Sequence, residues 1–187
     1  MPPKIAAAAG FQPVFNVSPI TGVLSIVMHR RILLTIALLL LPAATQAAGD
    51  APLDRATLRG LKGVGVVIDV LDSELQKLGV TRDALTARLA ARLQAGRITI
   101  DPSATEFLAL RITAVRQGRG TLALALSFGL YQPVLLSRNH DIRTSTQTWE
   151  VDTVLMADPK VVLTACAETA DDLADRFAAA FHSTNPE

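Results

Sequence analysis

The chain has 187 residues, of which 50% are hydrophobic and 19% charged, and its formal net charge is +1. Such an apolar and evenly charged chain is not disordered as a whole, and its length suits one modest domain. Its single cysteine excludes a disulfide framework within the chain and a cysteine-rich zinc site.

The segment before residue 48 has the layout of an export signal. Met28–Arg31 is a short basic region, Ile32–Leu41 is an apolar run with one threonine, and Pro42–Ala47 carries small residues at its third-last and last positions. This pattern predicts a secretory signal peptide over residues 28–47, cleaved after Ala47. A membrane anchor is the alternative, but it needs roughly 20 apolar residues, about twice this run.

Residues 1–27 precede the basic region and show no clear periodicity. We interpret them as a mis-called upstream extension, with an unusually long basic region as the alternative. Cleavage removes Lys4, Arg30 and Arg31 but no acidic residue, so the mature chain is slightly acidic. Without a basic excess, nucleic acid is not an expected partner. The protein is predicted to be periplasmic or secreted, without a stable membrane anchor after cleavage.

The mature part divides into a loose lead-in, residues 48–60, and a single domain, residues 61–187. β-Branched residues over 61–71 predict a strand. Residues 72–78 are typical of a single helical turn, which Gly79 ends.

Two longer helices are predicted from their caps and apolar spacing. Thr81 suits the N-cap of a helix over 82–95, with Gly96 as the residue after its C-cap. Asp158–Pro159 predicts the start of the final helix, which Asn185–Pro186 ends. The apolar stripe of this helix comprises Val162, Cys166, Ala170, Leu173, Phe177 and Phe181.

Alternating apolar and polar residues between the helices predict strands. The alternating segments are 107–116, 121–131 and 144–155. Glycine-rich residues 117–120 predict a hairpin, Pro133 is expected to end the second strand, and 137–143 to form a polar loop. The fold class that follows is α+β: a two-layer sandwich with a mostly antiparallel sheet of four to five strands and two helices on one face.

No motif for catalysis, cofactor binding or metal ligation is found. Cys166 lies within an apolar stripe, which favours a buried structural thiol over a nucleophile. Ser137, His140 and Asp141 have the residue types of a catalytic triad, but one short loop seldom gives them the required geometry. An enzyme using His140, Asp141 or Cys166 is the least favoured alternative.

The final helix carries charges that need an interpretation. His182, in its last turn, is predicted to be a solvated cation at the helix end. An acidic face is formed by Glu168, Asp171, Asp172 and Asp175. We interpret this face as solvated, with a docking surface for a basic partner as the alternative.

Small side chains on the outward face of the sheet mark the candidate contact surface. The candidate partner-binding residues are Ala123, Ala125, Ser127, Thr146 and Thr148. One interpretation is a plain exposed sheet. The other is that a partner or another copy of the chain packs there, or adds a strand at the sheet edge.

Four segments, in order, carry a resemblance: residues 58–98, LYQPVLLSRN, TQTWEV and LADRFAAAFHSTNP. Together, over about Leu58 to Pro186, they resemble a family of small secreted bacterial proteins of unassigned function. Their plan is also similar to envelope accessory domains such as the N-terminal domain of TolB and the CsgG-like lipoproteins. The resemblance brings no catalytic residues. Because no lipidated cysteine follows the signal, it implies a soluble periplasmic protein.

The leading hypothesis is therefore a non-catalytic periplasmic protein that binds another envelope component, and self-association is left open. The runner-up is a binder of a small amphiphilic or lipid-like ligand, held in a groove near Trp149 and Tyr131.

Overall fold

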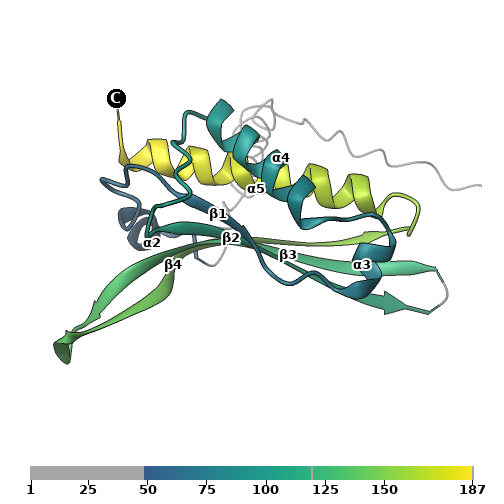
Figure 1. Ribbon diagram of the computed structural model, residues 1–187, viewed down its shortest axis with the longest axis horizontal. Coiled ribbons are helices and arrows are strands. Elements are labelled where there is room, and N and C mark those ends of the chain that lie inside the picture. Colours follow the sequence, from purple (N-terminus) through teal and green to yellow (C-terminus); the bar gives the residue numbers. More distant parts are fainter. Residues whose placement is uncertain (1–48, 119, 187) are drawn as a thin grey trace, which may run out of the picture. The chain divides into compact units, whose positions relative to one another are not determined.

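The computed structural model describes residues 49–186 apart from residue 119 (Figure 1). The predicted upstream extension, residues 1–27, and signal peptide, residues 28–47, lie outside the described residues. The elements in chain order are α2 (Pro52–Ala56), β1 (Gly65–Ile68), α3 (Ser73–Lys77), α4 (Arg82–Ala95), β2 (Phe107–Gln117), β3 (Thr121–Leu136), β4 (Asn139–Ala157) and α5 (Val162–Thr184).

The sheet has four strands in the order β1-β2-β3-β4. β2, β3 and β4 are consecutive antiparallel neighbours, whereas β1 pairs with β2 in parallel. The parallel pair arises because α3 and α4 carry the chain back to the end of the sheet where β1 began. The α+β class is confirmed, and the sheet is mixed.

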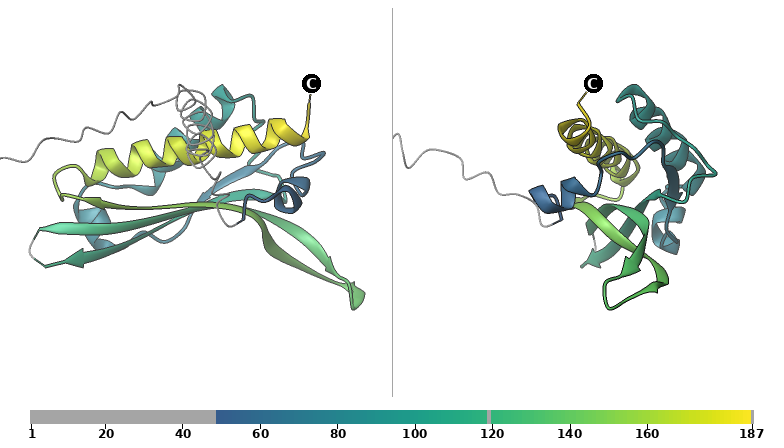
Figure 2. Two further views of the ribbon diagram at one scale, coloured as in Figure 1. Left: turned by 180° about the vertical axis from the view of Figure 1, so that it is seen from behind. Right: turned by 90° about the vertical axis from the view of Figure 1, so that its left-hand side faces the viewer.

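Both long helices lie over the same side of the sheet (Figures 1 and 2). α4 packs beside β1 and α5 beside β3 and β4, and the helices contact each other. Phe177 of α5 meets Phe128 and Trp149 edge-on, at ring-centroid distances of 6.4 and 5.1 Å. Every residue of the predicted α5 stripe is buried except Phe181, which is partly buried. These aromatic contacts centre the core where β3, β4 and α5 meet.

The bounds of α4 are as predicted, and Thr81 Oγ1 accepts a hydrogen bond from the Ala84 amide at 3.3 Å. The start of α5 differs: the helix begins at Val162 rather than at Pro159. Asp158 instead closes a separate turn, because its carboxylate accepts from the Lys160 amide and its carbonyl from the Val161 amide. The Asp-Pro pair marks a turn before the helix.

Gly96 was expected to follow the C-cap of α4, but it is the C-cap itself, with φ of −77°, and the positive φ of 61° falls on the next residue, Arg97. The structure gives another reason for glycine here. A Cβ at residue 96 would lie 3.0 Å from the Cβ of Ala178. Gly96 therefore allows the end of α4 to approach α5 closely.

β3 and β4 continue past the rest of the sheet as a two-stranded ribbon, residues 132–146, which we call the arm (Figure 1). Pro133 was expected to end β3, and residues 137–143 were expected to be a loop. Instead β3 reaches Leu136, and β4 resumes at Asn139. β2 begins at Phe107, opposite Tyr131, and does not reach Pro133. Pro133 therefore lies where β3 has one neighbour and a proline is tolerated.

The predicted lead-in, residues 48–60, is not loose where the structure describes it. Leu58 is fully buried in the core. Asn185, at the end of α5, donates from Nδ2 to the Leu58 carbonyl at 3.0 Å and accepts from the Gly60 amide at 2.7 Å. These contacts make the segment part of the domain.

We expect Gly96→Ala to lower the free energy of unfolding by about 1–3 kcal/mol, because the added methyl group overpacks the α4–α5 contact. Gly120→Ala is the matched control, since a Cβ there meets nothing within 4 Å. Urea unfolding, followed by the fluorescence of the single tryptophan, measures both variants. Equal stability of the two variants would contradict the packing argument.

Candidate functional site

The face of the sheet opposite α4 and α5, the outer face, carries a row of exposed apolar side chains. Strand pairing aligns Val115 of β2 with Ala123 of β3 and Met156 of β4. The next row along β3 aligns Ala125 with Val154. Val115, Val154 and Met156 are 58%, 72% and 54% exposed. We call these five residues the apolar strip.

Three of the five predicted contact residues lie on this face. Ala123 and Ala125 are in the centre of the apolar strip, flanked by its three larger side chains. Ser127 follows on the same face, and its hydroxyl donates to the Glu150 carboxylate. Small residues in the middle keep the strip flat, which lets another protein surface approach closely.

The other two predicted residues, Thr146 and Thr148, are not on the outer face. Leu130 pairs with Trp149 and Tyr131 pairs with Gln147, so Thr148 is an extra residue in β4. One inserted residue reverses the alternation of side chains beyond it. Thr148 Oγ1 accordingly donates to Gln132 on the helix side of the sheet, at 2.7 Å.

Sequence reasoning missed the larger members of the strip. Glu150 and Asp152 face outward on β4, and the same alternation continues to Val154 and Met156. On β2, the alternation that places Arg111 outward also places Val115 outward. The alternation of side chains along β2 and β4 could therefore have predicted that Val115, Val154 and Met156 face outward.

The ligand groove expected near Trp149 and Tyr131 is not formed, because the two rings lie on opposite faces of the sheet. Trp149 is buried under α5. Tyr131 stacks on Phe107 of the outer face at 5.2 Å, and its hydroxyl donates to Gln147 at 3.0 Å. An apolar hollow of about 410 Å³ lies instead between the starts of α4 and α5, with Leu163 in its wall.

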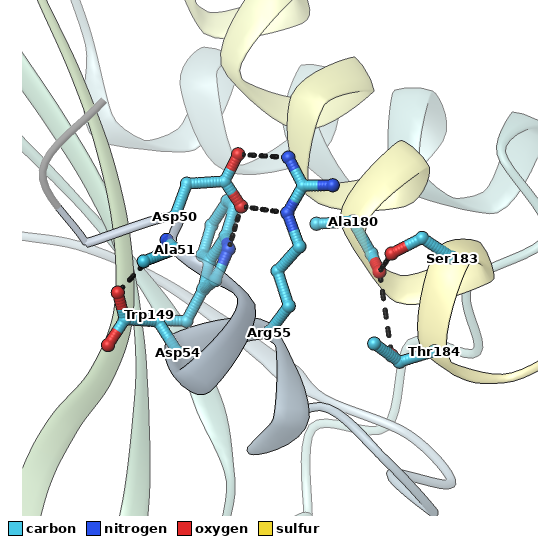
Figure 3. Close-up of polar contacts among 8 residues, drawn as sticks. All are labelled: Asp50, Ala51, Asp54, Arg55, Trp149, Ala180, Ser183 and Thr184. Carbon is cyan, nitrogen blue, oxygen red and sulfur yellow. Dashed lines mark hydrogen bonds and ion pairs between the residues drawn. The ribbon is translucent and has the colours of Figure 1, made fainter. Parts of the chain in front are cut away.

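A strap, residues 49–57, covers part of the free edge of β4 (Figure 3). The Gly49 carbonyl accepts from the Glu150 amide at 3.0 Å, and Thr57 Oγ1 reaches the Thr148 carbonyl at 3.4 Å. Gly49 has φ of +90°, and a Cβ there would lie 2.8 Å from the Glu150 carbonyl oxygen, so glycine is required. Within the described residues, no strand pairs with this edge at Val154.

Asp50 anchors the strap to the core (Figure 3). Its carboxylate accepts from Trp149 Nε1 at 2.8 Å and from Arg55 Nε and Nη2 at 2.7 and 2.6 Å. Burial by itself raises the pKa of Asp50, but the hydrogen bonds from Arg55 and Trp149 outweigh it and hold the pKa below its ordinary value. The ionised form therefore stabilises the closed strap.

The side chains considered for catalysis are not assembled with one another. Ser137, His140 and Asp141 are exposed near the turn of the arm. Cys166 is fully buried in α5, and burial raises the pKa of its thiol to about 11. A thiol at that pKa is protonated at neutral pH and a poor nucleophile.

Two other predictions for α5 are changed by contacts with α4. Arg88 binds Asp171 through two hydrogen bonds, and Arg92 binds Asp175 in the same way. The acidic face is therefore partly a clamp between the helices, because two of its four carboxylates are engaged. His182 was expected to be solvated, but it is partly buried and its Nε2 lies 2.8 Å from the Gly96 carbonyl.

Among residues 49–186, no cluster of three or more His, Cys, Asp or Glu is placed to hold a metal ion. None of the helices that the structure describes is long and apolar enough to cross a bilayer.

No protein-family model matches the chain, and neither does any curated protein sequence. Solved structures align loosely with the chain, among them the following two. A PelC dodecamer from Paraburkholderia phytofirmans, solved as a point variant, is 15% identical, over 64% of this chain and 86% of that chain, with a TM-score of 0.36. A minor lipoprotein from Acinetobacter baumannii is 16% identical, over 66% of this chain and 92% of that chain, with a TM-score of 0.32.

Asp50→Asn is expected to lower the free energy of unfolding at pH 7 by about 1–3 kcal/mol, because a partly buried, charge-assisted network is weakened. The pKa of Asp50 is lowered on folding, so its contribution is complete above the unfolded pKa and is lost as the pH falls through the folded pKa. The wild type should therefore lose more stability than Asp50→Asn from about pH 5 downwards. Tryptophan fluorescence during urea unfolding measures the difference.

The control for this test is Asp141→Asn on the exposed turn of the arm, which should follow the wild-type pH profile. An Asp50→Asn profile parallel to that of the wild type would contradict the role of the carboxylate in closing the strap.

Cys166 should not react with an aromatic disulfide reagent at pH 8 in the folded protein, because the thiol is buried and its pKa is about 11. Stoichiometric reaction is expected once urea unfolds the chain. Fast labelling of the folded protein would show that this part of α5 opens readily.

Proposed function

We propose that this chain is a non-catalytic periplasmic protein that binds another protein of the cell envelope through its outer face. The observation that carries the proposal is the apolar strip, in which three large side chains more than half exposed surround two alanines. Contiguous apolar patches on a protein surface usually mark binding sites.

The form of the strip favours a protein over a small molecule. Small ligands are held in concave pockets that bury most of their surface. The strip lies on a strand face, and within the described residues the neighbouring edge of β4 at Val154 is free to pair with an added strand. A protein partner can use both features at once. The hollow beside Leu163 is the place where an amphiphile would be sought, and it lies on the helix side.

The periplasmic compartment rests on the predicted signal peptide, residues 28–47. The non-catalytic role is supported by the separation of the candidate groups. His140 is exposed on the arm, whereas Cys166 is buried in α5 with a protonated thiol.

Site-specific photo-crosslinking in intact cells tests the proposal. Probes replace Ala125 and Val154 in the apolar strip, and a matched control probe replaces Asp172 on α5. Discrete adducts from the strip probes, absent from Asp172, are expected because only the strip is buried by a partner. Mass spectrometry then identifies the attached protein.

Diffuse labelling that is equal at Ala125, Val154 and Asp172 would contradict the proposal. A second readout is Ala125→Arg, which should abolish the adduct from the Val154 probe while leaving the melting temperature within about 2 °C of the wild type, as for a surface substitution.

A further inference from the structure

We propose that the apolar strip binds the arm of a second copy of this chain, so that copies associate head to tail. This inference rests on the proposed function, because it takes the outer face as a protein-binding surface, and it names the protein that binds there. Five features of the described residues lead to it.

The arm presents apolar and cationic side chains together. Leu135 of β3 pairs with Arg143 of β4, so their side chains are cross-strand neighbours on one face of the ribbon. Leu135 is 53% exposed and Ile142, beside Arg143, is 42% exposed. Arg138 lies in the turn that joins the strands. The arm therefore combines two exposed apolar residues with two arginines and one aspartate, Asp141.

The strip presents the complementary combination. Val154 and Asp152 are two residues apart on β4, so both project from the outer face. Glu150 follows on the same face. Asp152 is exposed, and Arg176 of α5 donates to its backbone carbonyl at 3.1 Å, whereas its carboxylate takes no partner among the described residues. Leu135 of the arm can pack on the strip while Arg143, its neighbour on the same face of the ribbon, meets the carboxylate beside the strip.

The arm cannot reach the strip of its own chain. The strip lies next to the turn between β2 and β3, and that turn and the arm are at opposite ends of the sheet (Figure 1). The stretch of β3 from Ala123 in the strip to Leu135 in the arm spans roughly 40 Å at the rise of an extended strand. Contact between these surfaces therefore requires two chains.

A contact between two strips, or between two arms, is unfavourable. A contact of strip on strip places the surface that carries Asp152 and Glu150 against a surface of the same charge, and a contact of arm on arm does the same with the surface that carries Arg138 and Arg143. Like charges across an interface are repulsive. The favoured contact is heterologous, and such contacts repeat from copy to copy into a ring or a filament.

The arm also lacks support within its own chain. Beyond Tyr131 it is a ribbon of two strands, and most of its side chains are exposed. A two-stranded hairpin without a packed face is marginally stable in water. Docking on the strip of another copy supplies that face.

Charge reversal tests the pairing. The protein purified from cells expressing the full chain is studied by sedimentation velocity over a range of concentrations at low salt. Arg143→Glu and Asp152→Arg should each raise the dissociation constant more than about tenfold, because like charges then face each other. Association should return in the double variant and in an equimolar mixture of the two single variants.

The matched controls are Arg59→Glu and Asp172→Arg, exposed residues outside both surfaces, which should associate like the wild type. Thermal unfolding of every variant checks that the fold is retained. A second pair keeps the test decisive if a charge reversal does not fold. Leu135→Asp disables the arm but leaves the strip intact, and Val154→Asp disables the strip but leaves the arm intact. A mixture of the two variants has one working arm and one working strip per pair, so association should stop at a one-to-one dimer.

A monomer at every concentration would overturn this inference but not the proposed function, which the identity of the crosslinked protein tests separately. Association unchanged by both reversals, or loss that neither the double variant nor the mixture restores, would overturn the pairing of arm and strip. If the strip probes crosslink nothing at all, both proposals fail together.

Discussion

The extra residue in β4, Thr148, is the constraint on which most of this structure depends. It turns Trp149 towards α5 and Gln147 towards the outer face, although only one residue separates them in the chain. On one side of it β4 belongs to the four-stranded sheet, and on the other side it belongs to the arm. Because a side-chain period of two reverses at a single insertion, the bulge decides what each face of β4 presents.

The strap, residues 49–57, packs against β4 next to this bulge. Trp149 needs an acceptor for its indole N–H because it is almost fully buried, and Asp50 supplies one. Arg55 then neutralises that carboxylate, and the Gly49 carbonyl covers the Glu150 amide at the edge of β4. The segment that follows the predicted cleavage site is thus tied to the centre of the core by polar bonds. Farther along β4, the edge at Val154 and the outer face remain uncovered by the described residues.

The helix side is closed in a different way. α4 and α5 approach each other through Gly96 and are joined by the pairs Arg88–Asp171 and Arg92–Asp175. These pairs are exposed, so each contributes little to stability, about 0–1 kcal/mol. The two ion pairs matter more for partner binding, because they engage carboxylates that could otherwise have attracted a basic partner. The outer face, with its apolar strip, is left as the surface where a partner is expected.

Local features of the sequence determined the elements whose residues interact over short distances. Thr81 and the leucine spacing predicted α4, the stripe from Val162 predicted the buried face of α5, and alternation predicted the inward side of β2 and β3. Alternation likewise placed Ala123 and Ala125 outward. Each depends on the helical or strand period, which the residues themselves carry.

Tertiary structure alone decided the rest, because the deciding partner lies far away in the chain. The bulge at Thr148 depends on pairing with β3, and the need for glycine at residue 96 depends on Ala178. Pro133 could stay in a strand only because β2 does not extend beyond the residue opposite Tyr131. Val115 and Met156 became one surface only when strand pairing aligned them across Ala123. A periodic pattern states which side of its own strand a residue takes, whereas the neighbours it meets there are set by packing between distant segments.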